Sequence, residues 1–174
     1  MASIKLRDIK LEDTENILKW KNDKNVKKNF CIQEDLTREV HLNWYYNKIL
    51  TGNVKQFIIF DEENQLDVGS TYLRDIDLKN KKAEFGIFIG EDCARGKGIG
   101  TKSAELTIKY AFEQLKLHKV FLRVFSNNIA GIKAYEKAGF TYEGTAKDDI
   151  LVNNTYFQDI IFMSIINKKE NNLL

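Results

Sequence analysis

The apolar positions alternate with a period of two in some stretches and follow helical spacing in others, and this pattern predicts the order of the elements. Period-two or continuous β-forming runs predict seven strands, at residues 3–8, 55–60, 67–75, 83–90, 119–125, 140–144 and 155–165. Helical spacing and capping residues predict helices that begin near residues 14, 37, 98 and 128. The turn at 153–154 is expected to join the last two strands.

The helix that follows residue 98 has the most regular apolar stripe in the chain. Its apolar residues recur at positions i, i+4, i+7, i+8 and i+11, which are Ala104, Ile108, Ala111, Phe112 and Leu115. A strand precedes this helix and another follows it. A right-handed crossover makes such strands parallel, whereas the strands at 55–60, 67–75 and 83–90 suit an antiparallel meander. The sequence therefore predicts a mixed sheet of the α/β or α+β class.

The length and the continuity of the pattern favour a single domain. The chain has 174 residues, enough to bury a proper core, and it contains no internal repeat and no linker. We expect one domain over residues 1–166 and a polar, frayed tail over 167–174.

Composition and charge exclude several classes of partner. Apolar residues make up 43%, charged residues 30%, and the net charge is +2, so no electrostatic argument favours nucleic acid or an anionic membrane. No apolar run approaches the roughly 18 residues of a membrane helix, and no signal-peptide pattern precedes the first charges. We expect a cytoplasmic protein in which Cys31 and Cys93 are free thiols and which holds no metal.

A glycine-rich stretch at residues 95–101, Arg-Gly-Lys-Gly-Ile-Gly-Thr, lies between a predicted strand and a predicted helix. We name it the glycine loop. Glycines let the backbone N–H groups point outward, and the start of a helix carries partial positive charge. The sequence therefore predicts that the glycine loop binds the pyrophosphate of a nucleotide-containing cofactor.

Two motifs together resemble those of the GNAT N-acetyltransferases. Arg95-x-x-Gly98-x-Gly100 is similar to the family's acetyl-CoA signature, and residues 128–140, Asn-Ile-Ala-Gly-Ile-Lys-Ala-Tyr-Glu-Lys-Ala-Gly-Phe, resemble its second cofactor motif. The Ala-Glu-Phe-Gly run at 83–86 resembles the family's fourth strand. This resemblance implies the GNAT fold, in which a mixed sheet of about seven strands has flanking helices and a splayed parallel strand pair.

The resemblance implies acetyl-CoA as the co-substrate and assigns residues to it. Main-chain groups of the glycine loop would hold the pyrophosphate, and those of Phe88 and Ile89 would hold the acetyl carbonyl and pantetheine. The full set of cofactor-binding candidates is Phe88, Ile89, Arg95, Gly96, Lys97, Gly98, Ile99, Gly100, Thr101, Asn128 and Lys137. Lys97 and Lys137 are alternatively solvated surface lysines, and Asn128 is alternatively a plain helix cap. At position 131 the family prefers Ala or Ser, and this chain has Gly.

The same resemblance implies two catalytic residues. Glu84 matches the strand glutamate that removes a proton from the amine, directly or through water, and Tyr135 matches the tyrosine that protonates the departing thiolate. Glu84 could instead be a salt-bridged strand residue, and Tyr135 could be a core tyrosine. His41 and His118 lie in no catalytic motif and are expected to be ordinary.

The identity of the amine acceptor is the least determined feature. Trp20-Lys21-Asn22-Asp23 and His41-x-x-Trp44 resemble regions of bacterial acetyltransferases that modify 4-amino sugars on nucleotide carriers, while the general layout also resembles Rim-type ribosomal-protein and spermidine acetyltransferases. We favour the amino-sugar nucleotide, with Trp20, Lys21, Trp44 and Arg74 as acceptor-binding candidates. A polyamine, a ribosomal-protein N-terminus and a non-catalytic acyl-CoA-binding domain are the alternatives. Either tryptophan could instead pack in the core. We expect a monomer or homodimer.

Overall fold

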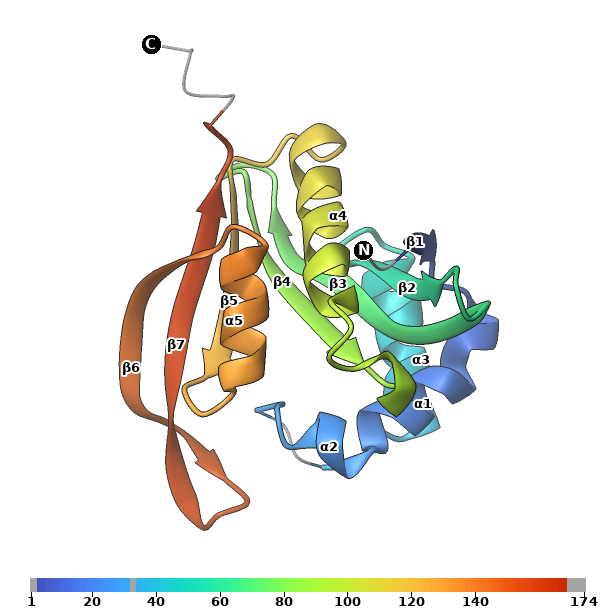
Figure 1. Cartoon of the computed structure of the whole chain (residues 1–174), viewed down its shortest axis with the longest axis horizontal. Coiled ribbons are helices and arrows are strands. Elements are labelled where there is room, and N and C mark those ends of the chain that lie inside the picture. Colours follow the sequence, from blue (N-terminus) through green and yellow to red (C-terminus); the bar gives the residue numbers. More distant parts are fainter. Residues whose placement is uncertain (1–2, 32–33, 169–174) are drawn as a thin grey trace.

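The computed structural model describes residues 3–31 and 34–168 of the chain (Figure 1). Their strands form one seven-stranded sheet in the order β1-β2-β3-β4-β5-β7-β6. The strands are β1 Ile4–Asp8, β2 Lys55–Asp61, β3 Leu66–Asp77, β4 Lys82–Ile89, β5 Lys119–Phe125, β6 Thr141–Val152 and β7 Tyr156–Ile166. β4 and β5 are parallel and the other neighbours are antiparallel, which confirms the predicted mixed sheet.

Helices cover both faces of the sheet. The α-helices are α1 Thr14–Asn22, α2 Lys24–Lys27, α3 Arg38–Trp44, α4 Ile99–Glu113 and α5 Ile129–Lys137, and a π-helical turn, Tyr45–Ile49, extends α3. Successive side chains along a strand point to opposite faces of the sheet, so the buried residues form separate clusters on the two faces. Ile58 packs in a cluster with α1 and α2, whereas its neighbour Ile59 packs in a cluster that includes Ile99 of α4. Among the described residues no helix is long and apolar enough to cross a membrane.

Local capping explains where several helices begin. The side chain of Thr37 accepts a hydrogen bond from the backbone N–H of Val40 at the start of α3, and Asn128 caps α5 in the same way through Gly131. The short helix α2 was not predicted, because it lies in a polar stretch with a single buried residue, Val26.

The hairpin at the end of the chain is longer than the sequence pattern predicts. The turn residues Asn153 and Asn154 are both left-handed, as expected for a turn without glycine. The strand before them, however, runs from Thr141 to Val152, so the prediction of a strand ending at residue 144 was wrong. Its register against β7 shifts between Ala146 and Ile150, which accommodates the polar residues 147–149 in a bulge. Of the predicted tail, residues 169–174 lie outside the described part.

The parallel strands β4 and β5 pair over a short length and then diverge, which opens a gap in the sheet. They pair only at three positions, Lys82 with Lys119, Ala83 with Val120 and Glu84 with Phe121. From Phe85 onward β4 continues along β3 without β5. The parallel pair is therefore splayed, as the family resemblance implied. Its divergence leaves main-chain groups of β4 open to a ligand.

Candidate active site

A cavity of about 1380 Å³ occupies the splay between β4 and β5. The glycine loop and α5 line one end, and residues of α1 to α3 line the other, where Lys21, His41 and Trp44 are found. Glu84 lies in the wall between them. The cavity therefore joins the predicted phosphate-binding loop to the predicted catalytic and acceptor residues.

The glycine loop needs glycine at two of its positions. Gly96 and Gly98 have φ of +73° and +79°, a backbone conformation that side chains with a β-carbon rarely adopt. Gly98 is the residue that precedes α4, so the loop delivers the positive end of the helix dipole to the cavity. Thr101, on the first turn, donates a 3.4 Å hydrogen bond from Oγ1 to the carbonyl of Ala134 in α5. This geometry suits an anionic phosphate group.

The two cations of the glycine loop occupy different positions. The Arg95 guanidinium donates to the carbonyls of Ile89 (3.2 Å) and Gly90 (3.4 Å) and forms ion pairs with Asp23 and Asp92. It thereby ties the loop to the end of β4. Lys97 is exposed and does not line the cavity, which fits its alternative interpretation as a solvated lysine.

Asn128 lines the cavity and also caps α5, since its Oδ1 accepts a 3.0 Å hydrogen bond from the backbone N–H of Gly131. A β-carbon at position 131 would lie 2.8 Å from the Asn128 amide nitrogen. Glycine at this position therefore gives room for the cap. Lys137, at the end of α5, lines the cavity as well.

Glu84 is held by two arginines. Its carboxylate accepts hydrogen bonds from Nε (3.1 Å) and Nη2 (2.8 Å) of Arg74 and from Nε (3.1 Å) and Nη2 (3.3 Å) of Arg123. Burial alone would raise the pKa of Glu84, but the two guanidiniums outweigh burial and hold the pKa below its usual range. Glu84 is therefore ionised at neutral pH and is a weak base.

We expect Glu84→Gln to lower the free energy of unfolding by about 3 kcal/mol, because it removes the buried charge that compensates two guanidiniums. The depressed pKa means that the carboxylate stabilises the fold above the ordinary glutamate pKa of about 4.3, and that this stabilisation disappears as the pH falls through the lower folded-state pKa. Urea unfolding at pH 7 and pH 3 measures the difference.

The control for this substitution is Glu143→Gln. Glu143 pairs with Lys119 at 2.6 Å, but its side chain is 40% exposed, so its loss should cost less than about 1 kcal/mol. An equal, pH-independent effect of the two substitutions would contradict the role of Glu84 as a buried charge.

Tyr135 reaches the cavity from α5, on the other side of the sheet from Glu84. Its ring packs edge-on against Phe85 and Phe140, with both centroid distances 6.1 Å. Burial, with a smaller effect of Tyr72, raises the pKa of Tyr135, so the phenol is protonated at neutral pH. The ring of Tyr72 lies against Gly86 of β4, where a β-carbon would overlap it. The splay thus brings a carboxylate and a phenol from opposite faces to one cavity.

Lys21 brings a further cation to the cavity wall. Its Nζ lies 5.0 Å from the ring centroid of Phe30 and 6.0 Å from that of Phe88. No carboxylate forms an ion pair with it within the described residues. Burial, and then repulsion by Arg74, lowers the pKa of Lys21. An anionic ligand would relieve both effects.

The two tryptophans have different positions. Trp44 lines the cavity, and its indole N–H donates a 3.0 Å hydrogen bond to Oε1 of Gln56. Trp20 is 1% exposed and packs on Gly90, and its indole N–H donates to Glu91 at 2.7 Å. Trp20 is not among the lining residues, so its core interpretation, rather than an acceptor contact, agrees with the structure.

Two polar residues of the wall were missed as site candidates. Arg123 was not considered, although a lone arginine among the β-forming residues 119–125 could have drawn attention to it. His41 was expected to be ordinary, but it lines the cavity and is 2% exposed. Arg123 lies in no motif, whereas the His41-x-x-Trp44 resemblance could have identified His41 as an acceptor-site candidate.

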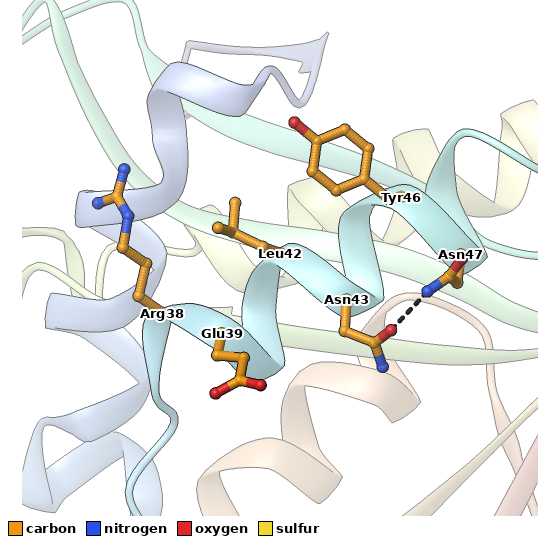
Figure 2. A pocket seen from close by; sticks show the side chains of 6 residues that line it. All are labelled: Arg38, Glu39, Leu42, Asn43, Tyr46 and Asn47. Carbon is orange, nitrogen blue, oxygen red and sulfur yellow. Dashed lines mark hydrogen bonds between the residues drawn. The ribbon is translucent and has the colours of Figure 1, made fainter.

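A second, shallow hollow lies on the outer surface of α3 and its π-helical turn (Figure 2). Its lining residues are Arg38, Glu39, Leu42, Asn43, Tyr46 and Asn47. All six come from one continuous helical segment, and Arg38 is engaged in an ion pair with Glu15. Because no second element contributes a side chain, this hollow is not comparable to the main cavity as a site.

Comparisons with known proteins agree with this geometry. The model of the acetyltransferase (GNAT) domain matches residues 3–141. Spermidine N(1)-acetyltransferase of Vibrio cholerae is 28% identical over 169 residues, 97% of this chain and 95% of that protein. Acetyltransferase PseH of Campylobacter jejuni is 29% identical over 147 residues, 84% of this chain and 85% of that protein. The crystal structure of the Vibrio enzyme with CoA and spermine superposes with a TM-score of 0.86 at 25% identity, covering 94% of this chain and 95% of that one.

Proposed function

The chain belongs to the GNAT acetyltransferase family, and on this basis we propose that it acetylates the primary amine of a small molecule that carries negative charge. That it is an acetyl-CoA-dependent N-acetyltransferase follows from the family and from its relatives. The proposal concerns the acceptor, for which an amino sugar on a nucleotide carrier is the favoured class.

The charge of the inner wall carries the proposal. We give the name inner wall to the part of the cavity that is lined by Lys21, Arg74, Arg123 and Glu84. Within the described chain it has three cations, and Glu84 is its one carboxylate. The other carboxylates that line the cavity, Glu34 and Asp35, are exposed, and Asp35 forms an ion pair with Lys27. Such a wall attracts a phosphate-bearing acceptor and repels a polycation.

We assign the cofactor to the end of the cavity nearest the glycine loop. The pyrophosphate would lie against main-chain N–H groups of residues 95–101 at the start of α4. The pantetheine arm would pass Asn128, and the thioester would lie in the splay, where β4 has left β5. Acetyl-CoA then supplies the activated acetyl group to an amine that enters from the side of α1 to α3.

The reaction requires an amine with a free electron pair and a proton for the departing thiolate. Tyr135 is protonated and lines the cavity, so we propose that its hydroxyl donates this proton. Glu84 is a weak base because Arg74 and Arg123 occupy its oxygens. It serves better as the anchor of these two arginines, with the amine losing its proton through water.

A polyamine is the second candidate acceptor, and the resemblance to spermidine N(1)-acetyltransferase favours it. The exposed carboxylates Glu34 and Asp35 would have to bind its ammonium groups. Among the residues that the structure describes, the inner wall offers a polyamine no free carboxylate, since that of Glu84 is already engaged. We therefore place the polyamine second.

A panel of amines tests the proposal through release of CoA thiol from acetyl-CoA, with the acetylated product identified by mass. The panel contains a UDP-linked 4-amino sugar, glucosamine, spermidine and an N-terminal peptide. We expect the fastest turnover with the UDP-linked amine. Turnover of spermidine or the peptide alone would refute an anionic acceptor.

A further inference from the structure

One buried polar atom in the cavity wall has no partner within the described residues. His41 is 2% exposed, and its Nε2 makes no hydrogen bond to the described part of the chain. An unpaired buried donor or acceptor costs roughly 1–3 kcal/mol, and native proteins seldom leave one. The fold therefore carries at His41 a hydrogen-bonding atom that its own packing does not use.

His41 lies on the side of α3 that lines the cavity, where a ligand could reach it. α3 presents two stripes of side chains, one to the outer hollow (Figure 2) and one, comprising Val40, His41 and Trp44, to the cavity. In the inner stripe the Trp44 indole N–H is already bonded to Gln56. His41 thus lines the acceptor end of the cavity, and its Nε2 has no hydrogen-bond partner within the described residues.

The surroundings of His41 indicate what kind of group it binds. Burial, followed by the charges of Lys21 and Arg38, lowers the pKa of His41, and Asp13 opposes them only in part. The imidazole is therefore neutral at pH 7 and has one N–H donor and one acceptor nitrogen. An ammonium group would gain no compensating charge there and would be repelled by Lys21, whereas a hydroxyl can donate or accept in either tautomer.

We infer that His41 selects acceptors that carry oxygen, through a hydrogen bond between its Nε2 and a hydroxyl of the acceptor. The inference rests on the proposed function, because it places the acceptor in this half of the cavity. The hydrogen bond to His41 requires a hydroxyl on the acceptor, which the charge of the inner wall does not require. Lys21 and the arginines favour a phosphate, and His41 favours the hydroxylated ring that bears the amine. A polyamine satisfies neither requirement.

The test compares His41→Leu, His41→Gln and the control His118→Leu, the other histidine of the chain, which does not line the cavity. Three acceptors separate the two requirements: a UDP-linked 4-amino sugar, glucosamine, which has hydroxyls but no phosphate, and spermidine, which has neither. Thermal unfolding without ligand is the second readout.

We expect His41→Leu to lower kcat/KM about 10-fold for both sugars and to leave spermidine unaffected. His41→Gln should recover part of the loss, because its amide can hydrogen-bond at a similar position. The Tm of His41→Leu should rise by about 2–4 °C, since a buried unpaired polar atom is replaced by an apolar side chain. His118→Leu should leave the ratio between acceptors unchanged.

Other results would contradict the inference about His41, the proposed anionic acceptor, or both. A lower Tm with an equal loss for all acceptors would make His41 a packing residue and overturn the inference, as would full activity of His41→Leu on both sugars. If the wild type acetylates glucosamine in a His41-dependent way but not the UDP-linked sugar, the anionic acceptor fails and the inference stands. Acetylation of spermidine alone overturns both.

Discussion

Replacing Tyr135 by phenylalanine is expected to lower kcat by about 10- to 100-fold while the protein remains folded. The phenyl ring keeps the edge-on contacts with Phe85 and Phe140, so the core loses only one oxygen atom. If the hydroxyl protonates the departing CoA thiolate, its loss removes general-acid assistance from the chemical step. KM for the amine should change little, because Tyr135 lies across the splay from the inner wall, where the acceptor is proposed to bind. Steady-state kinetics and thermal unfolding measure the two effects.

Tyr142→Phe is the matched control for this substitution. Tyr142 is 62% exposed on β6, and its hydroxyl forms a 3.0 Å hydrogen bond with Thr145. The substitution Tyr142→Phe removes the same atom from a residue that does not line the cavity, and should leave kcat unchanged. Turnover of Tyr135→Phe at the wild-type rate would remove Tyr135 from the reaction.

Lys21→Met is expected to lower kcat/KM for a UDP-linked amino sugar by about 10- to 100-fold. A hydrogen bond between an ammonium and a phosphate in a partly desolvated wall contributes roughly 1.5–3 kcal/mol. The loss should lie mainly in KM, because Lys21 would bind the acceptor without taking part in the chemistry. Activity on spermidine should stay the same or increase, since one repelling charge disappears.

The stability of this variant separates binding from folding. Lys21 has no carboxylate partner among the described residues, and its pKa is lowered by burial, so methionine in its place should leave the Tm unchanged or raise it. Lys24→Met, on the exposed surface of α2, removes the same charge outside the cavity and is the control. Equal losses for the two lysines, or a loss on spermidine as large as on the sugar, would show that Lys21 does not recognise a phosphate.

Features that depend on neighbouring residues could be predicted from the sequence. The glycine loop, the stripe of α4 and the caps at Thr37 and Asn128 are each specified within one or two helical turns. The parallel pairing of β4 and β5 followed from the crossover between them. These features carry the cofactor end of the site, which is why the sequence predicted that end in the most detail.

Features that depend on distant contacts could not be predicted. Arg123 belongs to the site because it binds Glu84, which lies 39 positions earlier in the chain. The parallel pairing of β4 and β5 brings the two residues together. The two tryptophans look alike in sequence, and only the packing of Trp20 on Gly90 separates them. The last part of β6 was not predicted, because its polar residues interrupt the strand pattern. Pairing with β7 keeps this part extended in the structure. The inner wall of the cavity depends on contacts of this kind between distant residues.

The inner wall is also the part of the site on which the proposed choice of acceptor depends. A carboxylate that is saturated by two guanidiniums cannot bind a polycation, and a buried neutral imidazole adds no negative charge. We therefore propose the same acceptor class from charge and, building on it, from hydrogen-bonding capacity. The resemblance to spermidine N(1)-acetyltransferase extends over 97% of this chain, so the acceptor has to be decided by measurement and not by similarity.

The most direct test is the ratio of kcat/KM for a UDP-linked 4-amino sugar to that for spermidine, measured on the wild-type protein at one pH and one ionic strength. The cationic wall predicts a ratio of at least about 100, which corresponds to roughly 2.7 kcal/mol of discrimination in the transition state. The ratio should fall as salt is added, because screening weakens the attraction for phosphate. A ratio below one would contradict the account and identify a polyamine as the acceptor.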